Sequence, residues 1–190
     1  MKAKKILQKE EAVLRKVAKE VPLSDIPKVK IKKILREMKA SLNSQSDGVA
    51  IAAPQIGYSL RIFVVSGKIF SKDFVNDQTR PPRPSATPPS QEEMAKDMIF
   101  INPKISKLSR EKEWIPEGCL SIRPIYGKTF RSKKATVTAY DENGKKFTRG
   151  ASGLLAQVFQ HETDHLNGIL FIDHARDLKE ENIHEQNKFS

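Results

Sequence analysis

The sequence predicts an α+β fold, because helical patterns lie near both ends of the chain and short strand patterns lie between them. An amphipathic helix pattern covers 25–43, and residues 152–166 have the composition of a later helix. At 190 residues the chain is expected to form one domain, 1–190, with a sizeable core. We find no internal repeat in the sequence.

Two helices are expected at the N-terminal end, over 9–20 and 25–43, because both stretches have helical composition and spacing. The second should present an apolar stripe formed by Ile26, Val29, Ile31, Ile34, Leu35 and Met38. Short strands are then expected at 59–65, 98–102, 117–122, 135–140 and 146–149. Residues 141–144 read Asp-Glu-Asn-Gly, which favours a hairpin turn between the last two strands.

A proline-rich stretch interrupts the region of strands. Five prolines occur within the nine residues 81–89, and proline disfavours both helix and sheet because it lacks a backbone N–H. We therefore expect an exposed, partly disordered inserted loop over 71–97. Residues 176–190 are expected to form a C-terminal tail. The first five residues lack the apolar run of a signal peptide or a membrane span.

The most informative segment is 160–168, which reads Gln-His-Glu-Thr-Asp-His-Leu-Asn-Gly. His161 and His165 are four residues apart, so on a helix both imidazoles lie on one face, about one turn apart. Two nitrogens placed in this way can bind one tetrahedral metal ion. Glu162 can reach a water held by that metal and act as a general base. The alternative is a chance pair of histidines on a solvated helix.

The third ligand separates the classes of metal site that share this motif. A metzincin would need a histidine where the chain has Phe171, so that class is excluded. A thermolysin-like peptidase would use a later carboxylate, for which Glu180, Glu181 and Glu185 are candidates. Little chain remains there to build the helix that such a ligand requires.

Cys119 is the upstream candidate for the third ligand, and it is the only cysteine in the chain. It cannot form an intramolecular disulfide, and it follows Gly118, which lets the backbone approach closely. A thiolate with two imidazoles leaves the fourth position of a tetrahedral metal open, as in catalytic sites. The alternative, which is the commoner role of a lone cysteine, is a small buried apolar residue.

A third segment, 48–57, reads Gly-Val-Ala-Ile-Ala-Ala-Pro-Gln-Ile-Gly, in which small residues let the main chain pass close to a ligand and Gln55 offers an amide donor. With 117–121 and 160–166 it resembles the peptide deformylase family. The family carries Gly-x-Gly-x-Ala-Ala-x-Gln, Glu-Gly-Cys-Leu-Ser and Gln-His-Glu-x-Asp-His-Leu, in this order. The chain matches the last two at every fixed position, and the first departs only at Ala50, where the family has glycine. The resemblance spans residues 5–175.

The resemblance implies mixed or antiparallel β-sheets around a central α-helix that carries the motif, with helices at the N-terminal end. It implies a metal-dependent hydrolase that removes the N-formyl group from the N-terminal formylmethionine of newly synthesised polypeptides and releases formate. Cys119, His161 and His165 would hold one divalent metal ion. Fe²⁺ is expected in the cell, and Zn²⁺, Ni²⁺ or Co²⁺ could replace it. His174 and His184 should not bind the metal.

The same resemblance implies roles for the residues around the metal. Glu162 would take the proton of the attacking water and later protonate the leaving amine. The further candidates are the Gln55 amide and the Leu120 backbone N–H as donors to the formyl oxygen, Val49, Leu154 and Val158 around the methionine side chain, and the backbone of Val49 and Gly118 alongside the peptide. Asp164 is expected to help orient the metal ligands without contacting the metal itself.

Two departures from the family pattern bear on substrate binding. Ala50 adds a methyl group beside the cleft, where it could narrow the cleft or shift the loop. Tyr126 stands where many relatives carry an arginine that fixes the substrate backbone, and Arg123 is a candidate to replace that contact from another angle.

The charge distribution suggests a second kind of partner. The net charge is +11, and residues 1–40 hold thirteen Lys or Arg against five Asp or Glu, while 128–146 hold six against two. Such a surface attracts polyanions, including ribosomal RNA, so ribosome binding through the basic surface is one hypothesis. The alternative is a solvated basic surface that only aids solubility. No RNA-binding aromatic motif occurs, and no membrane or specific DNA partner is expected.

Low cysteine use suits the cytoplasm. A basic RNA-associated protein with a structural zinc remains the non-enzymatic alternative.

Overall fold

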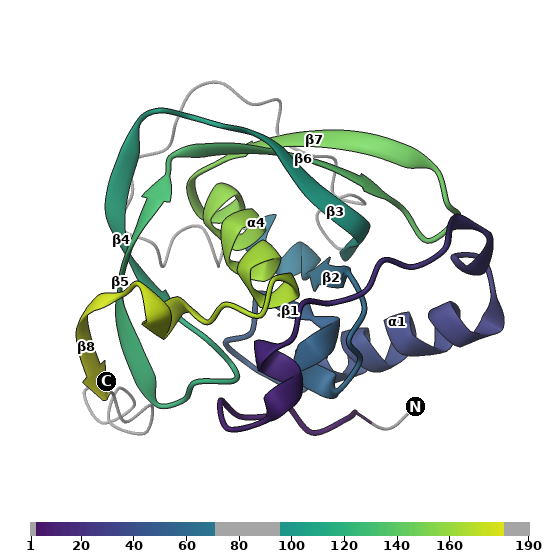
Figure 1. The fold of residues 1–190 in the computed structure, drawn as a ribbon, viewed down its shortest axis with the longest axis horizontal. Coiled ribbons are helices and arrows are strands. Elements are labelled where there is room, and N and C mark those ends of the chain that lie inside the picture. The colour runs from purple at the N-terminus through teal and green to yellow at the C-terminus, as the bar shows by residue number, and fades with distance from the viewer. Residues whose placement is uncertain (1–2, 71–95, 181–190) are drawn as a thin grey trace.

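The computed structural model describes residues 3–70 and 96–180, and the strands within these ranges form two antiparallel sheets (Figure 1). The larger sheet has the strand order β1-β2-β3-β6-β7, and the smaller has the order β4-β5-β8. The larger sheet consists of β1 (Ala50–Ala52), β2 (Ile62–Val65), β3 (Met98–Leu108), β6 (Lys134–Tyr140) and β7 (Lys146–Ser152). The smaller consists of β4 (Lys112–Gly118), β5 (Ile125–Ser132) and β8 (Arg176–Glu180). The described α-helices are α1 (Val29–Asn43) and α4 (Gly153–Leu166), so the expected α+β class is confirmed.

The larger sheet separates two hydrophobic clusters, because its strands place alternate side chains on opposite faces. On β2, Ile62 and Val64 pack in the cluster that contains the buried face of α1, whereas Phe63 packs in the cluster that contains α4. Strand β3 repeats the alternation with Ile99 on the first side and Phe100 on the second. The sheet therefore lies between the two helices.

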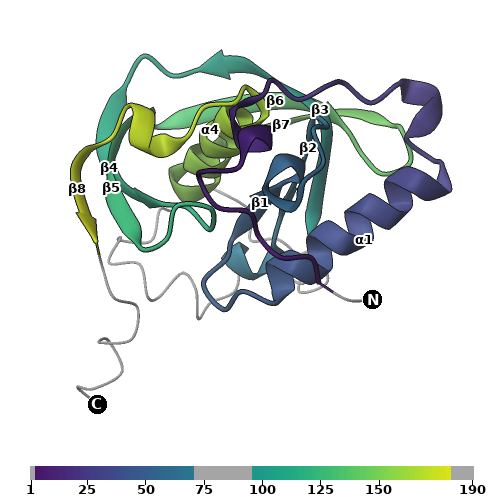
Figure 2. The ribbon, with the colours of Figure 1, turned by 60° about the horizontal axis from the view of Figure 1, so that its bottom comes forward.

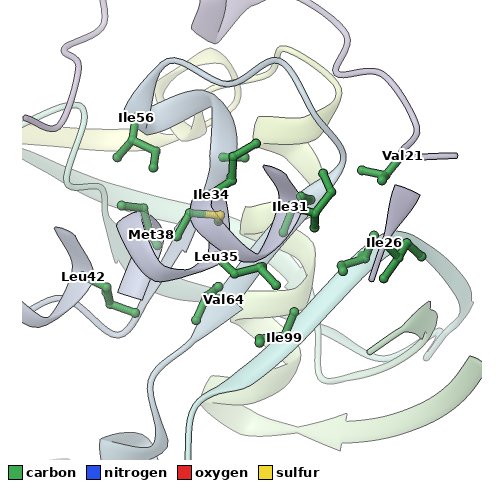
Figure 3. Close-up of a cluster of buried hydrophobic side chains, with 14 of the residues drawn as sticks. Val21, Ile26, Ile31, Ile34, Leu35, Met38, Leu42, Ile56, Val64 and Ile99 are labelled. Atoms are coloured by element: carbon green, nitrogen blue, oxygen red, sulfur yellow. The ribbon is translucent and has the colours of Figure 1, made fainter. Parts of the chain in front are cut away.

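Helix α1 covers one face of the larger sheet. Ile31, Ile34, Leu35 and Met38 are buried and point toward β2 and β3 (Figure 3). Val29, which the sequence placed in the same apolar stripe, is 77% exposed because it lies in the first turn, beyond the sheet. The stripe is therefore narrower than its sequence pattern indicates.

Helix α4 lies in the middle of the molecule, between the larger sheet and the strands β4 and β5 (Figures 1 and 2). Nine of its 14 residues are buried, as expected for a helix enclosed by other elements. Phe159 projects from it into an aromatic cluster, in which its ring lies 5.1 Å from that of Phe100 and 6.2 Å from that of Phe63. This packing fixes the face of the helix that carries the histidines.

The helix expected over 9–20 does not form. Only Ala12–Arg15 makes a short 3₁₀ turn. The backbone N–H of Ala18 donates instead to the carbonyl of Leu166, at the end of α4, over 2.9 Å. This part of the chain therefore satisfies its backbone through tertiary contacts, which a helix would not allow.

Other boundaries also differ from the expectation. The helix expected over 25–43 begins at Val29, after a separate 3₁₀ turn at Leu23–Asp25. The strand expected over 117–122 ends at Gly118, where β4 gives way to a turn. Residues 176–180, expected to lie in the tail, form β8 along the edge of β5.

Besides β8, the sequence did not anticipate the strands β1 and β5 or most of β4. The expected hairpin turn at 141–144 does join β6 to β7. Most of the proline-rich segment, 71–95, and the residues after 180 lie outside the described residues. Within the described part of the chain, no helix is both long and apolar enough to cross a membrane.

Candidate metal centre and active site

The motif helix is held tightly at its C-terminal end. Gly168 follows α4 with a φ of +73°, a conformation that favours glycine. A Cβ atom there would lie 2.7 Å from the carbonyl oxygen of Arg15, so only glycine fits against the N-terminal segment. The helix is thus fixed at the turn that follows His165, which holds the motif in place.

The two histidines of α4 lie beside the turn that follows β4. Their ring centroids are 4.9 Å apart, as the four-residue spacing requires. The Nε2 atom of His165 lies 3.2 Å from the Sγ atom of Cys119. One ligand atom from each of Cys119, His161 and His165 falls within 4.8 Å of the others. The expected trio is therefore brought together.

This donor set fits a divalent metal ion. One thiolate and two imidazoles are ligands that zinc and other first-row transition metals accept, and a tetrahedral site of this kind has one open position. His174, by contrast, is not part of the group; it lies 3.8 Å from the carboxylate of Asp164. His184 falls outside the described residues, as do Glu181 and Glu185, while Glu180 is exposed on β8.

His161 is oriented by Glu117, the last buried side chain of β4. The Nδ1 atom of His161 lies 2.7 Å from Oε1 of Glu117, which leaves Nε2 for a metal. Burial alone would raise the pKa of Glu117, but the charges and hydrogen bonds of His161 and Arg131 hold it well below its usual range. Burial would lower the pKa of His161, yet Glu117 raises it well above its ordinary value.

Glu117 belongs to a buried network on β5 and α4. Arg131 donates to both carboxylate oxygens of Glu117, from Nη2 over 2.7 Å and from Nε over 3.1 Å. Its Nη1 donates to Asp164 over 2.6 Å, and the Thr129 hydroxyl donates to Glu117 over 2.6 Å. Asp164, expected to support the ligands, thus acts on His161 through two intervening side chains. Glu117 and Arg131 were not anticipated in this role, because they are 44 and 30 residues before His161 in the sequence.

Two polar atoms at the centre have no hydrogen-bond partner among the described residues. They are Oε2 of Glu162 and Nδ1 of His165, and both side chains are buried. Burial raises the pKa of Glu162 to about 7, although the charge of His161 opposes the shift. Burial and the charge of His161 lower the pKa of His165 well below its ordinary value. An unpartnered carboxylate oxygen beside the ligands is poised to bind an exogenous group.

Gln55 extends toward the same centre from the 3₁₀ turn Ala53–Ile56. Its Oε1 atom accepts the backbone N–H of Ala52 over 2.8 Å, which fixes the orientation of the amide. Its Nε2 atom then faces Ser121 Oγ at 3.1 Å and Cys119 Sγ at 3.5 Å. The side chain is almost fully buried, so its N–H donors are positioned before any ligand arrives.

A cavity of about 360 Å³ opens onto this centre. Cys119, His161 and Glu162 lie at its inner end together with Gln55. The remaining candidates from the sequence also line it, namely Val49, Gly118, Leu120, Leu154 and Val158. Every candidate site residue except His165 therefore lines one cavity. The Nε2 atom of His165 lies next to the cavity residue Cys119.

The two departures from the family pattern both lie at this cavity. Ala50 is 6% exposed, and its side chain belongs to the hydrophobic cluster around α4. Tyr126 pairs with Gly118 across β4 and β5, and a Cβ atom on Gly118 would lie 2.5 Å from its ring. Gly118 must therefore be glycine because the Tyr126 ring covers it. Arg123 lines the cavity as well, bound to Asp47.

Comparisons with known proteins agree with this geometry. A family model described as polypeptide deformylase matches residues 3–181. Peptide deformylase 2 of Clostridium acetobutylicum is 38% identical over 91% of this chain and 95% of its own, and a peptide deformylase of Dehalococcoides mccartyi is 35% identical over 97% and 92%. The crystal structure of a Synechococcus elongatus peptide deformylase in complex with actinonin superposes with a TM-score of 0.71 at 32% identity, over 96% of this chain and 81% of that one.

Proposed function

The chain belongs to the polypeptide deformylase family, and from this we propose that Cys119, His161 and His165 together bind the single divalent metal ion of its active site. The protein is a metal-dependent hydrolase that removes the N-formyl group from the formylmethionine of newly synthesised polypeptides and releases formate. The observation that carries the assignment of ligands is the approach of the three ligand atoms to within 4.8 Å of one another.

Held by Cys119, His161 and His165, a divalent metal ion would lower the pKa of a water molecule, which would serve as the nucleophile of hydrolysis. Glu162 accepts the proton of this water at its unpartnered Oε2 atom and later gives it to the leaving amine. A carboxyl group with a pKa near 7 can perform both transfers at neutral pH. The formyl carbon loses its bond to nitrogen, and formate and a free N-terminus result.

The formyl oxygen gains negative charge during the attack, and we assign its stabilisation to two N–H donors. One is Nε2 of Gln55, which is held by the contact of its Oε1 with Ala52. The other is the backbone N–H of Leu120, in the turn between Cys119 and Ser121. Fixed donors at such a position typically contribute ~10²–10³ in rate each.

The peptide is expected to bind between two strand edges. Both β1 and β4 are edge strands of their sheets, and both border the cavity. The carbonyl of Val49 already accepts the backbone N–H of Ser66 over 2.8 Å. Because backbone groups alternate in direction along an antiparallel pair, the carbonyl of Ala50 should face the open edge. We expect the backbone of Ala50 and Gly118 to pair with the peptide. The backbone of Val49, which the resemblance implied for this pairing, faces β2 instead, because the N–H and carbonyl of one residue point to the same side of a strand.

The side chain of the formylated methionine is assigned to the apolar part of the cavity. Leu154 and Val158 are one helical turn apart on α4 and both line it, together with Val49 and Ile115. An unbranched thioether side chain fills such a space without a polar partner.

For the metal itself we propose Fe²⁺ in the cell. Affinity at a mixed nitrogen and sulfur site favours zinc over iron, so occupancy by iron reflects its availability. A thiolate beside ferrous iron is open to oxidation. We expect the iron form to lose activity rapidly in air and the nickel or cobalt forms to retain it, and the mass of the Cys119 peptide should show the added oxygen. Iron and nickel forms of equal lifetime in air would contradict this assignment.

The experiment that tests the activity is formate release from formyl-Met-Ala-Ser by protein reconstituted with iron, nickel or zinc. We expect turnover that a chelator removes and the metal restores. Cys119→Ser should abolish it, whereas a peptidase with the same helix motif and a late carboxylate ligand would be largely unaffected. Absence of formate with all three metals would contradict the proposed site.

The partner that presents the substrate is proposed to be the ribosome, in the cytoplasm where nascent chains arise. Lys30, Lys32 and Arg36 lie on the exposed face of α1, where they can neutralise RNA phosphates. We expect co-sedimentation with ribosomes that weakens with salt, and a further loss in a Lys32→Glu, Arg36→Glu double variant. Lys179→Glu, on β8, is the control. Equal binding by all three proteins would overturn the assignment of this surface.

A further inference from the structure

Two oppositely charged side chains meet at the mouth of the catalytic cavity. Arg123 donates from Nη2 to Oδ1 of Asp47, and from Nη1 to Oε1 of Gln45 over 3.0 Å. Asp47 and Arg123 both line the cavity. The other carboxylates that line it, Glu117 and Glu162, are buried and lie at the metal centre. Among the lining residues, Asp47 and Arg123 are therefore the charged groups that an incoming peptide meets at the mouth.

The ion pair connects two loops that carry the site. Asp47 precedes β1, and Arg123 follows the turn that contains Cys119 and Leu120. The loop of Asp47 is held from its other side by Lys68, whose Nζ donates to the carbonyls of Gln45 over 3.2 Å and Ser46 over 3.1 Å. Lys68 thus anchors the backbone that carries the two side chains to which Arg123 donates.

The guanidinium remains within reach of a bound peptide. The side chain of Arg123 is 31% exposed and that of Asp47 is 45% exposed. A guanidinium has five N–H donors, and the contacts with Asp47 and Gln45 use two of them. Ion pairs at this degree of exposure contribute little stability, so a charged substrate group can compete for either partner.

The position of Tyr126 increases the importance of Arg123. Tyr126 lies over Gly118 beside the strand edge at which we expect the peptide to bind, at the position where many relatives carry an arginine. Arg123 is therefore the cation that the cavity mouth presents to the substrate residues that follow methionine.

We propose that Arg123, held by Asp47 and Gln45, is a specificity-determining residue that favours substrates with an acidic side chain at the first or second position after formylmethionine. The carboxylate of such a substrate takes N–H donors of Arg123 in competition with Asp47. A lysine at the same position is repelled by Arg123. This inference rests on the proposed function, because it concerns the selectivity of the same cavity.

The test compares formylated tripeptides with an amidated C-terminus, so that the only variable charge is the side chain. The peptides are formyl-Met-Glu-Ser and formyl-Met-Lys-Ser for the first position and formyl-Met-Ala-Glu and formyl-Met-Ala-Lys for the second. The measured quantity is the ratio of kcat/KM for the Glu peptide to that for the Lys peptide. We expect a ratio above one for the metal-loaded enzyme at one position at least.

The variants separate recognition of charge from mechanical support of the loops. Arg123→Gln should lower the Glu-to-Lys ratio by about three- to tenfold, and Asp47→Asn should raise it because the competing carboxylate is gone. Arg123→Lys should keep most of the preference, since it keeps the charge. Arg110→Gln removes an exposed arginine between β3 and β4, and it should leave the ratio unchanged.

Opposite shifts for Arg123→Gln and Asp47→Asn are the result that supports the proposal. A shift in the same direction would mean that the ion pair only braces the loops, and it would overturn the proposal. An unchanged ratio in Arg123→Gln, or an equal fall in Arg110→Gln, would also overturn it. Formate release from formyl-Met-Ala-Ser is measured in parallel, so that a failure of the proposed function is distinguished from a failure of this inference.

Discussion

Glu117 orients His161, one of the three proposed metal ligands, through a buried hydrogen-bond network. It accepts hydrogen bonds from Arg131 and Thr129 and contacts Nδ1 of His161, so the imidazole cannot rotate freely. Arg131 in turn contacts Asp164 on the motif helix. The orientation of the His161 imidazole therefore depends on a chain of buried polar contacts that extends from β4 through β5 to α4.

Replacement of Glu117 by glutamine should weaken metal binding by about 10–100-fold, because the amide cannot orient and polarise His161 as a carboxylate does. Arg131 would also lose the charge of its most buried partner. The measurement is competition for the metal with a chelator at pH 7. Glu142→Gln, in the turn between β6 and β7, serves as the control. Equal metal affinity in Glu117→Gln and the wild type would show that the contact does not support the ligand.

The sequence predicts which side chains would bind the metal, but not which residues hold those side chains in position. The spacing of His161 and His165 identifies them on a helix, and the single cysteine completes the set. Glu117 lies inside a recognisable motif, yet nothing in the motif indicates that it contacts a residue 44 positions later. The contact between Arg123 and Asp47 spans 76 positions and depends on the loops that the fold brings together.

Two glycines with positive φ, one of them directly after the motif helix, allow the effect of a close backbone contact to be isolated. Gly168 adopts a φ of +73° directly against the backbone of Arg15. Gly144 adopts a φ of +80° in the turn between β6 and β7, where an added Cβ atom would meet nothing within 4 Å. The two glycines thus share a backbone conformation and differ in their surroundings.

Substitution of Gly144 by alanine should cost about 1 kcal/mol of the free energy of unfolding, from backbone strain alone. Gly168→Ala should cost clearly more, about 2–4 kcal/mol, since it adds a clash with backbone to the same strain. Urea unfolding of both variants measures the difference. If the two variants lost the same stability, the close contact between α4 and the N-terminal segment would not be important.

Element boundaries show where sequence patterns are insufficient. The motif helix begins within one residue of its expected start and ends at its expected end, Leu166, because most of its residues are buried and many are good helix formers. The stretch 9–20 has a comparable composition, but Val17 is 68% exposed while Leu14 and Ala18 are buried. Its backbone donates to distant carbonyls, those of Leu166 and Ser59, and not to carbonyls within its own helix. No local sequence pattern reveals such partners.

The N-terminal segment around Arg15 contacts the chain that follows the motif helix. It crosses the surface near α4 (Figure 2) and is bonded there through Arg15, which contacts Asp173 in the 3₁₀ turn after the motif helix. Burial alone would raise the pKa of Asp173, but hydrogen bonds from Arg15 and from the backbone N–H of Leu170 lower it below its ordinary value. The folded state therefore favours the ionised carboxylate.

A folded pKa below the unfolded one stabilises the protein at neutral pH, and this contribution is lost as the pH falls through the folded pKa. Asp173→Asn should therefore be less stable than the wild type at pH 7, by about 0.2–1 kcal/mol for a partly exposed pair. The difference should shrink as the pH falls below the ordinary value of 3.8 for aspartate. Urea unfolding between pH 7 and pH 3 measures it, and a constant difference would exclude the ion pair as the cause.

The overall architecture was only partly predictable. Alternation along β2 and β3 places one face of the sheet against α1 and the other against α4, and this periodicity is visible in the sequence. The order of the strands is not, because β3 pairs with β6 across the intervening strands β4 and β5, which belong to the smaller sheet. Long-range pairing of this kind depends on the shared core and not on local propensity.

We propose that Cys119, His161 and His165 hold a metal ion, whereas Glu162 transfers protons and does not bind the metal. The most direct measurement determines metal content and formate release together for the wild type and Glu162→Gln, both reconstituted with nickel. We predict about one metal per chain in each protein, and a fall in kcat of at least ~10² in the variant. Near-normal turnover of Glu162→Gln at full metal occupancy would show that Glu162 is not the general base. Loss of the metal from that variant would show that Glu162 takes part in metal binding.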